Sequence, residues 1–290
     1  MKIGLIGTGL MGKPMALRLL EMGHQVWAYN RTVSKLEPLA QAGVTTSETV
    51  QEVVQAVDTL VLMLSDAAAI RAVLLQEPVR QTLCDRTLLQ MGTISPDDSR
   101  TLNQEFQALN ASYLEAPVLG SIGEAQSGNL IVMVGATPEQ YTRCAPLLQC
   151  FGPDPLHVGP VGSAAALKLA LNQLIGSLTT AFAQSLGLIQ REGVDVDLFM
   201  QVVRSSALYA PTFDKKLDRM VNRNFANPNF PTKHLLKDMN LFVETAQAVG
   251  LDASAAAAVR QVVQKAVDQG LADTDYSGLF SAVSPSEETS

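Results

Sequence analysis

The sequence predicts an α/β protein, in which a parallel, doubly wound sheet is joined by a long helix to a C-terminal all-α domain. Three observations support this fold class. Residues 1 to about 160 alternate short apolar runs with helical segments, as parallel sheets covered by helices do. A glycine-rich turn follows the first apolar run, where such folds bind ligands. From Ser163 the chain becomes rich in Ala and Leu and takes on a helical pattern.

The apolar runs give the strands in order. We expect them at Lys2–Ile6, Gln25–Tyr29, Thr59–Leu64, Thr87–Met91, Tyr113–Glu115 and Leu130–Val134, with a short one near His157. The second half gives the helices, which we expect at Ala164–Arg191, Asp197–Ser205, Thr212–Arg223, Thr232–Val249 and Ser254–Gln269. The boundary near Gly159–Gly162 divides the chain into domains 1–162 and 163–290. We expect the polar tail Ser284–Ser290 to be disordered.

The turn after the first strand reads Gly7-Thr8-Gly9-Leu10-Met11-Gly12. It has G-x-G-x-x-G spacing, with a strand before it and a helix after it. Gly7 allows the tight turn, Gly9 lets the main chain approach a pyrophosphate, and Gly12 lets helix and strand pack closely. The N-terminus of the helix presents free N–H groups to phosphate. The turn, with Leu10 and Met11, is therefore predicted to bind a dinucleotide in a Rossmann-type domain.

The three residues after the second strand, Asn30-Arg31-Thr32, select the nucleotide. An NAD site usually has Asp or Glu about 20 residues beyond the glycines, to bind the ribose 2′-hydroxyl. Here neutral Asn30 leaves a 2′-phosphate unrepelled, Arg31 offers it a fork of donors, and Thr32 offers a hydroxyl. We therefore expect NADP(H) as cofactor; the alternative is a solvated arginine in a loop.

Composition limits the partners. The net charge of −7 argues against nucleic acid and anionic membranes. The three cysteines, an odd number without metal-ligand spacing, indicate reduced thiols and no metal site. The chain enters its first strand without a signal peptide, and it contains no uninterrupted apolar stretch of about 18 residues. We expect a soluble, cytoplasmic protein without membrane attachment.

Lys168 is the leading candidate for chemistry. It lies in the apolar run Ala164–Asn172, although burying a lysine is costly. Asn172 is four residues further on, so that both side chains leave one helical face a turn apart. An ammonium beside a carbonyl oxygen can donate a proton or stabilise an alkoxide. The alternative is that Lys168 reaches the surface while Asn172 packs against main chain, and the spacing alone does not decide between the two.

Two further segments are candidates for binding an anionic ligand. In the segment Phe230–Met239, Lys233 and Lys237 lie one helical turn apart, and so do His234 and Asp238. Either pair could bracket an anion. The alternative is that these residues form ordinary charge pairs on a solvated helix. In the turn Leu119-Gly120-Ser121, successive main-chain N–H groups could cradle a carboxylate; the alternative is a loop that needs glycine for its backbone angles.

Taken in order, these motifs resemble the β-hydroxyacid dehydrogenase family over essentially the whole chain. The Asn30–Thr32 loop, Met63–Asp66 and Phe230–Met239 look most like the branch of NADPH-dependent glyoxylate and succinic semialdehyde reductases. The resemblance implies that Lys168 is the proton donor and that Asn172 helps hold the substrate. It also implies that Phe230, Lys237 and Asp238 close the site, the first two toward the cofactor and the third toward the substrate. The residues that it implies along the cofactor cleft are Met63, Leu64 and Thr93.

The chain departs from the family pattern at two places. Leu119 stands where the family usually has a serine whose hydroxyl binds the substrate carboxylate. The family's Asp-x-Ser-Thr segment is Gln90-Met91-Gly92-Thr93 here. Both departures bear on substrate identity and could favour a longer or less polar aldehyde.

We therefore expect an NADPH-dependent oxidoreductase that reduces small aldehyde and 2-oxo acids, such as succinic semialdehyde and glyoxylate, to hydroxy acids. One alternative is a 3-hydroxyisobutyrate-type dehydrogenase, which a strong NAD preference would favour. Another is a non-catalytic dinucleotide-binding protein, which the presence of Lys168 argues against, as it does against imine reduction. The apolar second domain is expected to support a homodimer or homotetramer.

Overall fold

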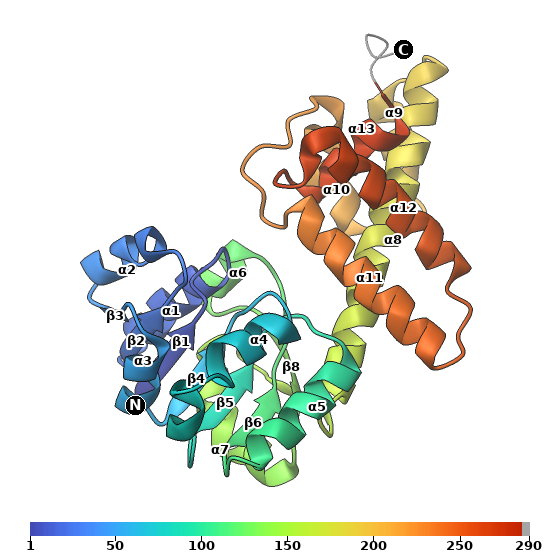
Figure 1. The fold of residues 1–290 in the computed structure, drawn as a ribbon. Helices are drawn as coiled ribbons and strands as arrows, with labels where there is room; N and C mark the ends of the chain where they lie inside the picture. Colours follow the sequence, from blue (N-terminus) through green and yellow to red (C-terminus); the bar gives the residue numbers. More distant parts are fainter. Residues whose placement is uncertain (286–290) are drawn as a thin grey trace. The chain divides into compact units, whose positions relative to one another are not determined.

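The computed structural model describes residues 1–285, which form two compact units, Met1–Lys168 and the chain from Leu169 onward (Figure 1). Residues 286–290, most of the tail expected to be disordered, lie outside the described residues. Ser284 differs from that expectation: it is buried, and its hydroxyl oxygen accepts a hydrogen bond of 2.8 Å from Arg191 Nη1. Within residues 1–285, no helix is both long and apolar enough to cross a membrane.

The first unit contains one sheet in the order β3-β2-β1-β4-β5-β6-β8-β7, with β9 paired to β8. Its strands are β1 (Lys2–Ile6), β2 (Gln25–Tyr29), β3 (Thr45–Ser47), β4 (Thr59–Leu62), β5 (Thr87–Gln90), β6 (Ser112–Glu115), β7 (Val118–Leu119), β8 (Ile131–Gly135) and β9 (Leu156–Gly159). Strands β1 to β6 are parallel. The doubly wound sheet is thus confirmed.

Strand β8 differs from the expected all-parallel order, because it runs antiparallel to both β6 and β7. Between β7 and β8 the only helix is α6 (Ile122–Ser127). At 1.5 Å per residue, such a helix is too short to return the chain to the opposite end of the sheet. Strand β8 therefore starts beside Leu119 of β7, and only its last residue, Gly135, pairs with Glu115 at the end of β6. Neither α6 nor β7 was expected from the sequence.

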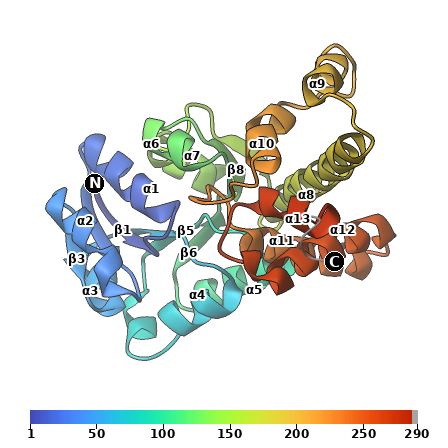
Figure 2. The same cartoon turned by 90° about the horizontal axis from the view of Figure 1, so that it is seen from above.

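Helices cover both faces of the sheet (Figure 2). One core cluster joins the sheet to α1 (Gly12–Glu21), α2 (Glu37–Gln41), α6 and α7 (Pro138–Leu148). A second cluster joins the opposite face to α3 (Val50–Ala56), α4 (Ala67–Leu74) and α5 (Pro96–Gln107). The central strands are buried on both sides, which leaves the strand ends as the positions for ligand-binding groups.

The second unit is helical, as expected. Helix α8 (Ser163–Arg191) begins in the first unit and continues into the second, where it packs with α9 (Val196–Arg204), α10 (Pro211–Val221), α11 (Thr232–Ala248), α12 (Ser254–Ala266) and α13 (Leu279–Val283). Helix α12 ends earlier than expected, because a π-helical turn follows it and contains Gly270 at φ 84°. The short α13 was not expected.

Helix α8 is apolar nearly all round, a pattern typical of buried helices. Only part of its surface is buried in the single chain: Leu174, Leu178 and Leu188 are 52%, 38% and 61% exposed. A row of leucines therefore remains at the surface of the single chain.

Candidate active site

The glycine turn lies at the carboxyl end of β1, where close approach of the main chain requires glycine. Gly7 has φ 98°, and a Cβ there would lie 2.4 Å from the carbonyl oxygen of Met63. A Cβ on Gly12 would lie 1.9 Å from the carbonyl oxygen of Gly7. Side chains at either position would push β1, β4 and α1 apart.

The same turn fits a pyrophosphate. A Cβ at Gly9 would meet nothing within 4 Å, so the main chain there is open to a ligand. Met11, the N-cap of α1, provides no side-chain cap for the N–H groups of the first turn. The buried Thr8 hydroxyl has no hydrogen-bond partner among the described residues. In that turn the N–H of Lys13 already donates to the carbonyl oxygen of Gly9 at 3.1 Å and Pro14 has no N–H, so the other main-chain donors and the orphaned Thr8 hydroxyl are the groups that fit the phosphates of a dinucleotide.

Asn30 connects this turn to the end of β2. Its Oδ1 accepts a hydrogen bond of 3.1 Å from the N–H of Thr8, and its Nδ2 donates one of 3.0 Å to the carbonyl oxygen of Thr32. Both Arg31 and Thr32 are exposed. The neutral amide thus shapes the loop, and the arginine beside it faces solvent at the edge that carries the glycine turn.

The ends of β4 and β5 lie at the same edge of the sheet. The N–H of Met63 donates a hydrogen bond of 2.8 Å to the carbonyl oxygen of Ile6, at the end of β1. Gly92 packs so closely on this segment that a Cβ would lie 2.4 Å from the carbonyl oxygen of Leu64. Met63, Leu64 and Thr93 are all half-buried. The residues expected to line the cofactor cleft therefore follow neighbouring parallel strands.

The Leu119–Ser121 turn follows β6 and β7. Gly120 has φ 140°, and a Cβ there would lie 2.7 Å from Leu130 Cδ2, so the turn does require glycine. Ser121 donates its main-chain N–H to Glu124 Oε2 at 2.8 Å, and its hydroxyl bonds to the same oxygen. One of the donors that we expected to face a ligand carboxylate is thus already bound by a carboxylate of the chain.

Glu115, at the end of β6, holds the start of α8. It is 1% exposed, and its Oε1 accepts hydrogen bonds from the N–H groups of Gly162, Ala164 and Ala165 at 2.8, 2.8 and 3.1 Å. The hydroxyl of Ser99 donates to its other oxygen. Burial raises the pKa of this carboxyl, and these hydrogen bonds oppose the rise. Sequence reasoning missed this role; the signal was a carboxylate at the end of a buried strand.

Lys168 lies one helical turn beyond the residues that Glu115 holds. It is 9% exposed, so its side chain does not extend into solvent as the alternative interpretation required. A lysine this deeply buried is rare and is retained where it has partners or a function.

In the second unit, Asn172, Lys237 and Asp238 come together. Asn172 Nδ2 donates a hydrogen bond of 2.6 Å to Asp238 Oδ2, and Lys237 Nζ lies 3.0 Å from Asp238 Oδ1. Asn172 is 1% and Asp238 2% exposed. The Oδ1 atom of Asn172 is buried and has no partner among the described residues, so the cluster retains an acceptor.

The other residues of this segment have different partners. Lys233 forms an ion pair with Asp273 and does not bracket an anion with Lys237. His234 stacks on Phe230 with ring centroids 6.3 Å apart, and burial together with the charge of Lys237 lowers the pKa of His234. Four-residue spacing put the two lysines on one face, but Asp273, from another segment, binds Lys233.

A buried ion pair supports the position of Phe230. Lys216 Nζ lies 2.8 and 2.9 Å from the two carboxylate oxygens of Asp275, which is fully buried, and 4.1 Å from the centroid of the Tyr276 ring. The N–H of Tyr276 donates a hydrogen bond of 3.1 Å to the carbonyl oxygen of Phe230, and the two rings meet edge to face. Sequence reasoning did not identify Lys216 or Asp275.

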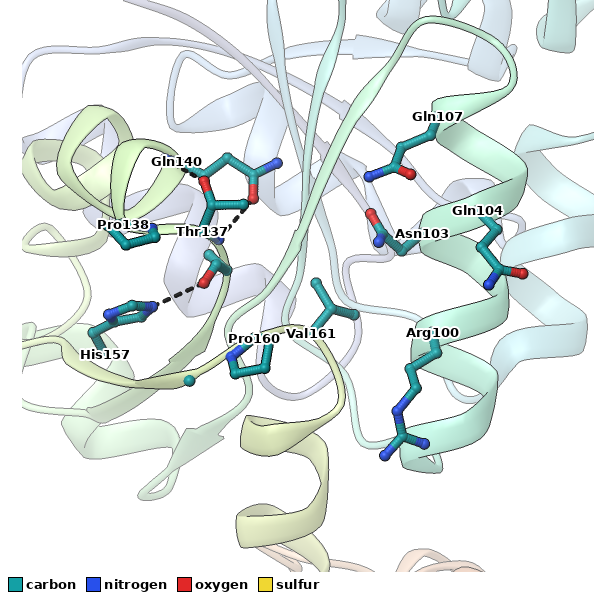
Figure 3. Close-up of a pocket in the computed structure, with 12 residues that line it drawn as sticks. Arg100, Asn103, Gln104, Gln107, Thr137, Pro138, Gln140, His157, Pro160 and Val161 are labelled. Atoms are coloured by element: carbon teal, nitrogen blue, oxygen red, sulfur yellow. Dashed lines mark hydrogen bonds between the residues drawn. The ribbon is translucent and has the colours of Figure 1, made fainter.

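A hollow of about 570 Å³ lies elsewhere in the first unit, between α5 and the segments that flank α7 and β9 (Figure 3). Amide side chains of α5 line one wall. On the other wall, His157 Nε2 bonds to the carbonyl oxygen of Ala136 at 2.8 Å. None of the predicted site residues lines this hollow.

Comparison with known protein families shows the class of protein to which this chain belongs. A family model described as the NAD binding domain of 6-phosphogluconate dehydrogenase matches residues 2–159. One described as NAD-binding of NADP-dependent 3-hydroxyisobutyrate dehydrogenase matches residues 162–283. Together with the glycine turn, these matches define an NAD(P)-binding oxidoreductase that acts on the CH–OH/carbonyl pair.

Individual relatives give the family. The chain is 31% identical to glyoxylate/succinic semialdehyde reductase 1 of Arabidopsis thaliana, over 99% of this chain and 100% of the relative. It is 30% identical to 2-hydroxy-3-oxopropionate reductase of Escherichia coli K12, over 98% and 97%. The chain therefore belongs to the β-hydroxyacid dehydrogenase family. The structure of 3-hydroxyisobutyrate dehydrogenase from Salmonella typhimurium shares the fold, with a TM-score of 0.86 at 24% identity over 96% and 98%.

Proposed function

We propose that this protein reduces small aldehydes and 2-oxo acids with NADPH, and that succinic semialdehyde and glyoxylate represent its substrates. The observation that carries the proposal is the buried Lys168, one helical turn before the buried Asn172. Two of the relatives support the substrate class, since they are named as reductases of glyoxylate, succinic semialdehyde and 2-hydroxy-3-oxopropionate.

Residues of the first unit would hold the cofactor. The N–H groups from Gly9 to Gly12 would bind the pyrophosphate, and the Asn30–Thr32 loop would bind the 2′-phosphate through Arg31. Met63, Leu64 and Thr93 would line the cleft. Phe230 and Lys237 of the second unit would approach the nicotinamide end. When bound, the reduced nicotinamide supplies a hydride to the carbonyl carbon.

The chain's own residues would supply the proton and the orientation. Lys168 would donate the proton from its Nζ to the carbonyl oxygen, where negative charge develops during reduction. Asn172 has a buried, unpartnered Oδ1, which would accept a hydrogen bond from the substrate or from the ammonium, while Asp238 fixes the amide through Nδ2. The Leu119–Ser121 turn would contact the remainder of the substrate.

The domain roles follow from this assignment. Residues 1–162 would bind NADP(H), and residues 163–290 would complete the substrate site and mediate assembly. The exposed leucines of α8 support a homodimer or homotetramer, because an apolar row in solvent is usually covered by a second subunit. The three free cysteines support a reducing, cytoplasmic location.

The second candidate is oxidation of a 3-hydroxy acid such as 3-hydroxyisobutyrate. The match of residues 162–283 to the model named for that dehydrogenase favours it. Initial rates in both directions, with NADP(H) and NAD(H), decide between the two. Faster reduction with NADPH supports the proposed function, and faster oxidation of 3-hydroxyisobutyrate, with NAD or with NADP⁺, supports the second candidate. Cofactor binding without turnover of any carbonyl or hydroxy acid would show a non-catalytic protein.

A further inference from the structure

The hollow beside α5 has no part in the proposed function. Its volume is about 570 Å³, and it lies between α5 and the segments that flank α7 and β9 (Figure 3). Small-molecule sites in proteins have volumes of roughly 300–1,000 Å³. The lining residues differ from those that we expect to hold the cofactor and the substrate. The hollow is thus large enough to hold a second small ligand with residues of its own.

One wall of the hollow carries an amide whose oxygen is unpaired. Asn103 and Gln107 of α5 are four residues apart, so their side chains leave one face of the helix. Figure 3 shows both side chains pointing toward the opposite wall. The Oδ1 atom of Asn103 is buried and has no hydrogen-bond partner among residues 1–285. Because buried acceptors are normally paired, this wall has a position for an N–H group of a ligand.

The opposite wall presents an aromatic ring that is held in place. His157 Nε2 bonds to the carbonyl oxygen of Ala136 at 2.8 Å, and its ring stacks on that of Tyr141 with centroids 5.0 Å apart. The hydroxyl of Tyr141 donates a hydrogen bond of 2.7 Å to the carbonyl oxygen of Pro155, which fixes the stack. His157 is itself exposed and lines the hollow, so that a flat ligand can stack on it.

The rest of the lining favours an uncharged ligand. Pro138, Pro160 and Val161 contribute apolar surface. Arg100 also lines the hollow, but its charge is offset by an ion pair with Asp97. An anionic ligand would have to compete with Asp97 for this arginine, whereas an uncharged aromatic ring would bury apolar surface against the prolines.

We propose that this hollow binds an uncharged adenine derivative of the adenosine type. Asparagine pairs with adenine through two hydrogen bonds, in which its Oδ1 accepts from the N6 amino group and its Nδ2 donates to N7. Asn103 would make this pair, and His157 would stack on the base, as aromatic side chains do where proteins bind single bases. Guanine has two acceptors, O6 and N7, on the corresponding edge, so it would leave Asn103 Oδ1 unpaired.

The test is calorimetric titration of adenosine into the protein after saturation with NADPH, with no aldehyde present. Because NADPH fills the cofactor site, the added adenosine does not bind there. We expect saturable binding of one adenosine per chain. Guanosine should bind about tenfold more weakly, because a bidentate contact to a base discriminates by roughly this factor or more.

Two variants and a control assign the binding to the hollow. Asn103→Leu removes the amide and keeps the size of the side chain, and it should weaken adenosine binding about tenfold. His157→Ala should weaken binding about fivefold or more through the loss of stacking, and it decides the matter if Asn103→Leu does not fold. Gln55→Leu is the matched control, because Gln55 is an exposed amide on α3 of the same unit. It should leave adenosine binding within twofold of the unsubstituted protein.

Three results would overturn the assignment: no saturable binding of adenosine, equal binding of guanosine, or undiminished adenosine binding in Asn103→Leu and His157→Ala. Reduction of succinic semialdehyde with NADPH checks that each variant is folded, and its rate should stay within twofold of the unsubstituted protein. The proposed function would stand in each of these cases, because Asn103 and His157 have no part in it.

Discussion

Glu115 Oε1 accepts a hydrogen bond of 2.8 Å from the main-chain N–H of Ala164, which fixes the first turn of α8 to the end of β6. The carboxylate lies at the positive end of a 29-residue helix. Lys168 follows one turn later on that helix, and the Leu119–Ser121 turn follows Glu115 in the chain. A single buried side chain thus connects the two segments of the first unit that the proposed chemistry uses.

We expect Glu115→Ala to destabilise the first unit. The substitution would leave the N–H groups of Gly162, Ala164 and Ala165 buried without their acceptor. An unsatisfied buried donor costs about 1–3 kcal/mol, so a loss of roughly 3 kcal/mol or more in the free energy of unfolding is expected. Urea denaturation measures it. Glu115→Gln keeps an acceptor oxygen and should lose much less; equal losses in both variants would show that the hydrogen bonds are not the cause.

The same carboxyl should make stability depend on pH. Burial raises the pKa of Glu115 above its ordinary value of 4.5, so the folded state holds this proton more tightly than the unfolded state. Its contribution is therefore fully present below pH 4.5 and is lost as pH rises through the raised folded pKa. The glutamine variant does not titrate there. The stability of the unsubstituted protein relative to Glu115→Gln should fall as the pH rises above 4.5. A difference that grows over this range would contradict the direction of the shift.

Local patterns predicted the parts of the site that lie within one βαβ unit. Gly12 is needed for a contact inside that unit, with the carbonyl oxygen of Gly7, so the spacing of the two glycines was informative, although Gly7 also makes room for Met63 after β4. Glu115 depends on partners 47 to 50 residues away, and nothing in its own segment marks them. Lys233 was placed on the face of Lys237, yet Asp273 from a distant loop binds it. Helical spacing determines the direction in which a side chain leaves the helix, whereas its partner depends on which distant segment packs against it.

Strands β7 and β8 show the same limit in the fold. The apolar run of β8 was predictable, but its direction depends on how far α6 can carry the chain. The two-residue β7 exists only because β8 pairs with it. Such short elements have no periodicity of their own, so a sequence pattern does not reveal them.

We expect Arg31→Ala to lower kcat/KM with NADPH and to leave kcat/KM with NADH nearly unchanged. A charge-assisted arginine–phosphate contact contributes about 1.5–3 kcal/mol, so kcat/KM for NADPH should fall by roughly 10- to 100-fold. The value for NADH should change little, because that cofactor has no 2′-phosphate for the guanidinium to bind. Steady-state kinetics with each cofactor at a saturating aldehyde concentration gives both numbers. Equal losses of kcat/KM with NADPH and NADH would mean that Arg31 shapes the loop and does not bind the 2′-phosphate.

We expect the Lys168→Ala variant to bind NADPH normally and to lose turnover. The substitution removes a proton donor, and general acid catalysis contributes about 10²–10⁴-fold, so turnover should fall by 10²-fold or more. The dissociation constant for NADPH, measured by the fluorescence of the reduced nicotinamide, should stay within about threefold, because the glycine turn and the Asn30–Thr32 loop are untouched. Lys265→Ala, at an exposed position on α12, controls for loss of a lysine as such. Normal turnover in Lys168→Ala would refute the proton-donor role, while loss of NADPH binding would place the amine in cofactor recognition.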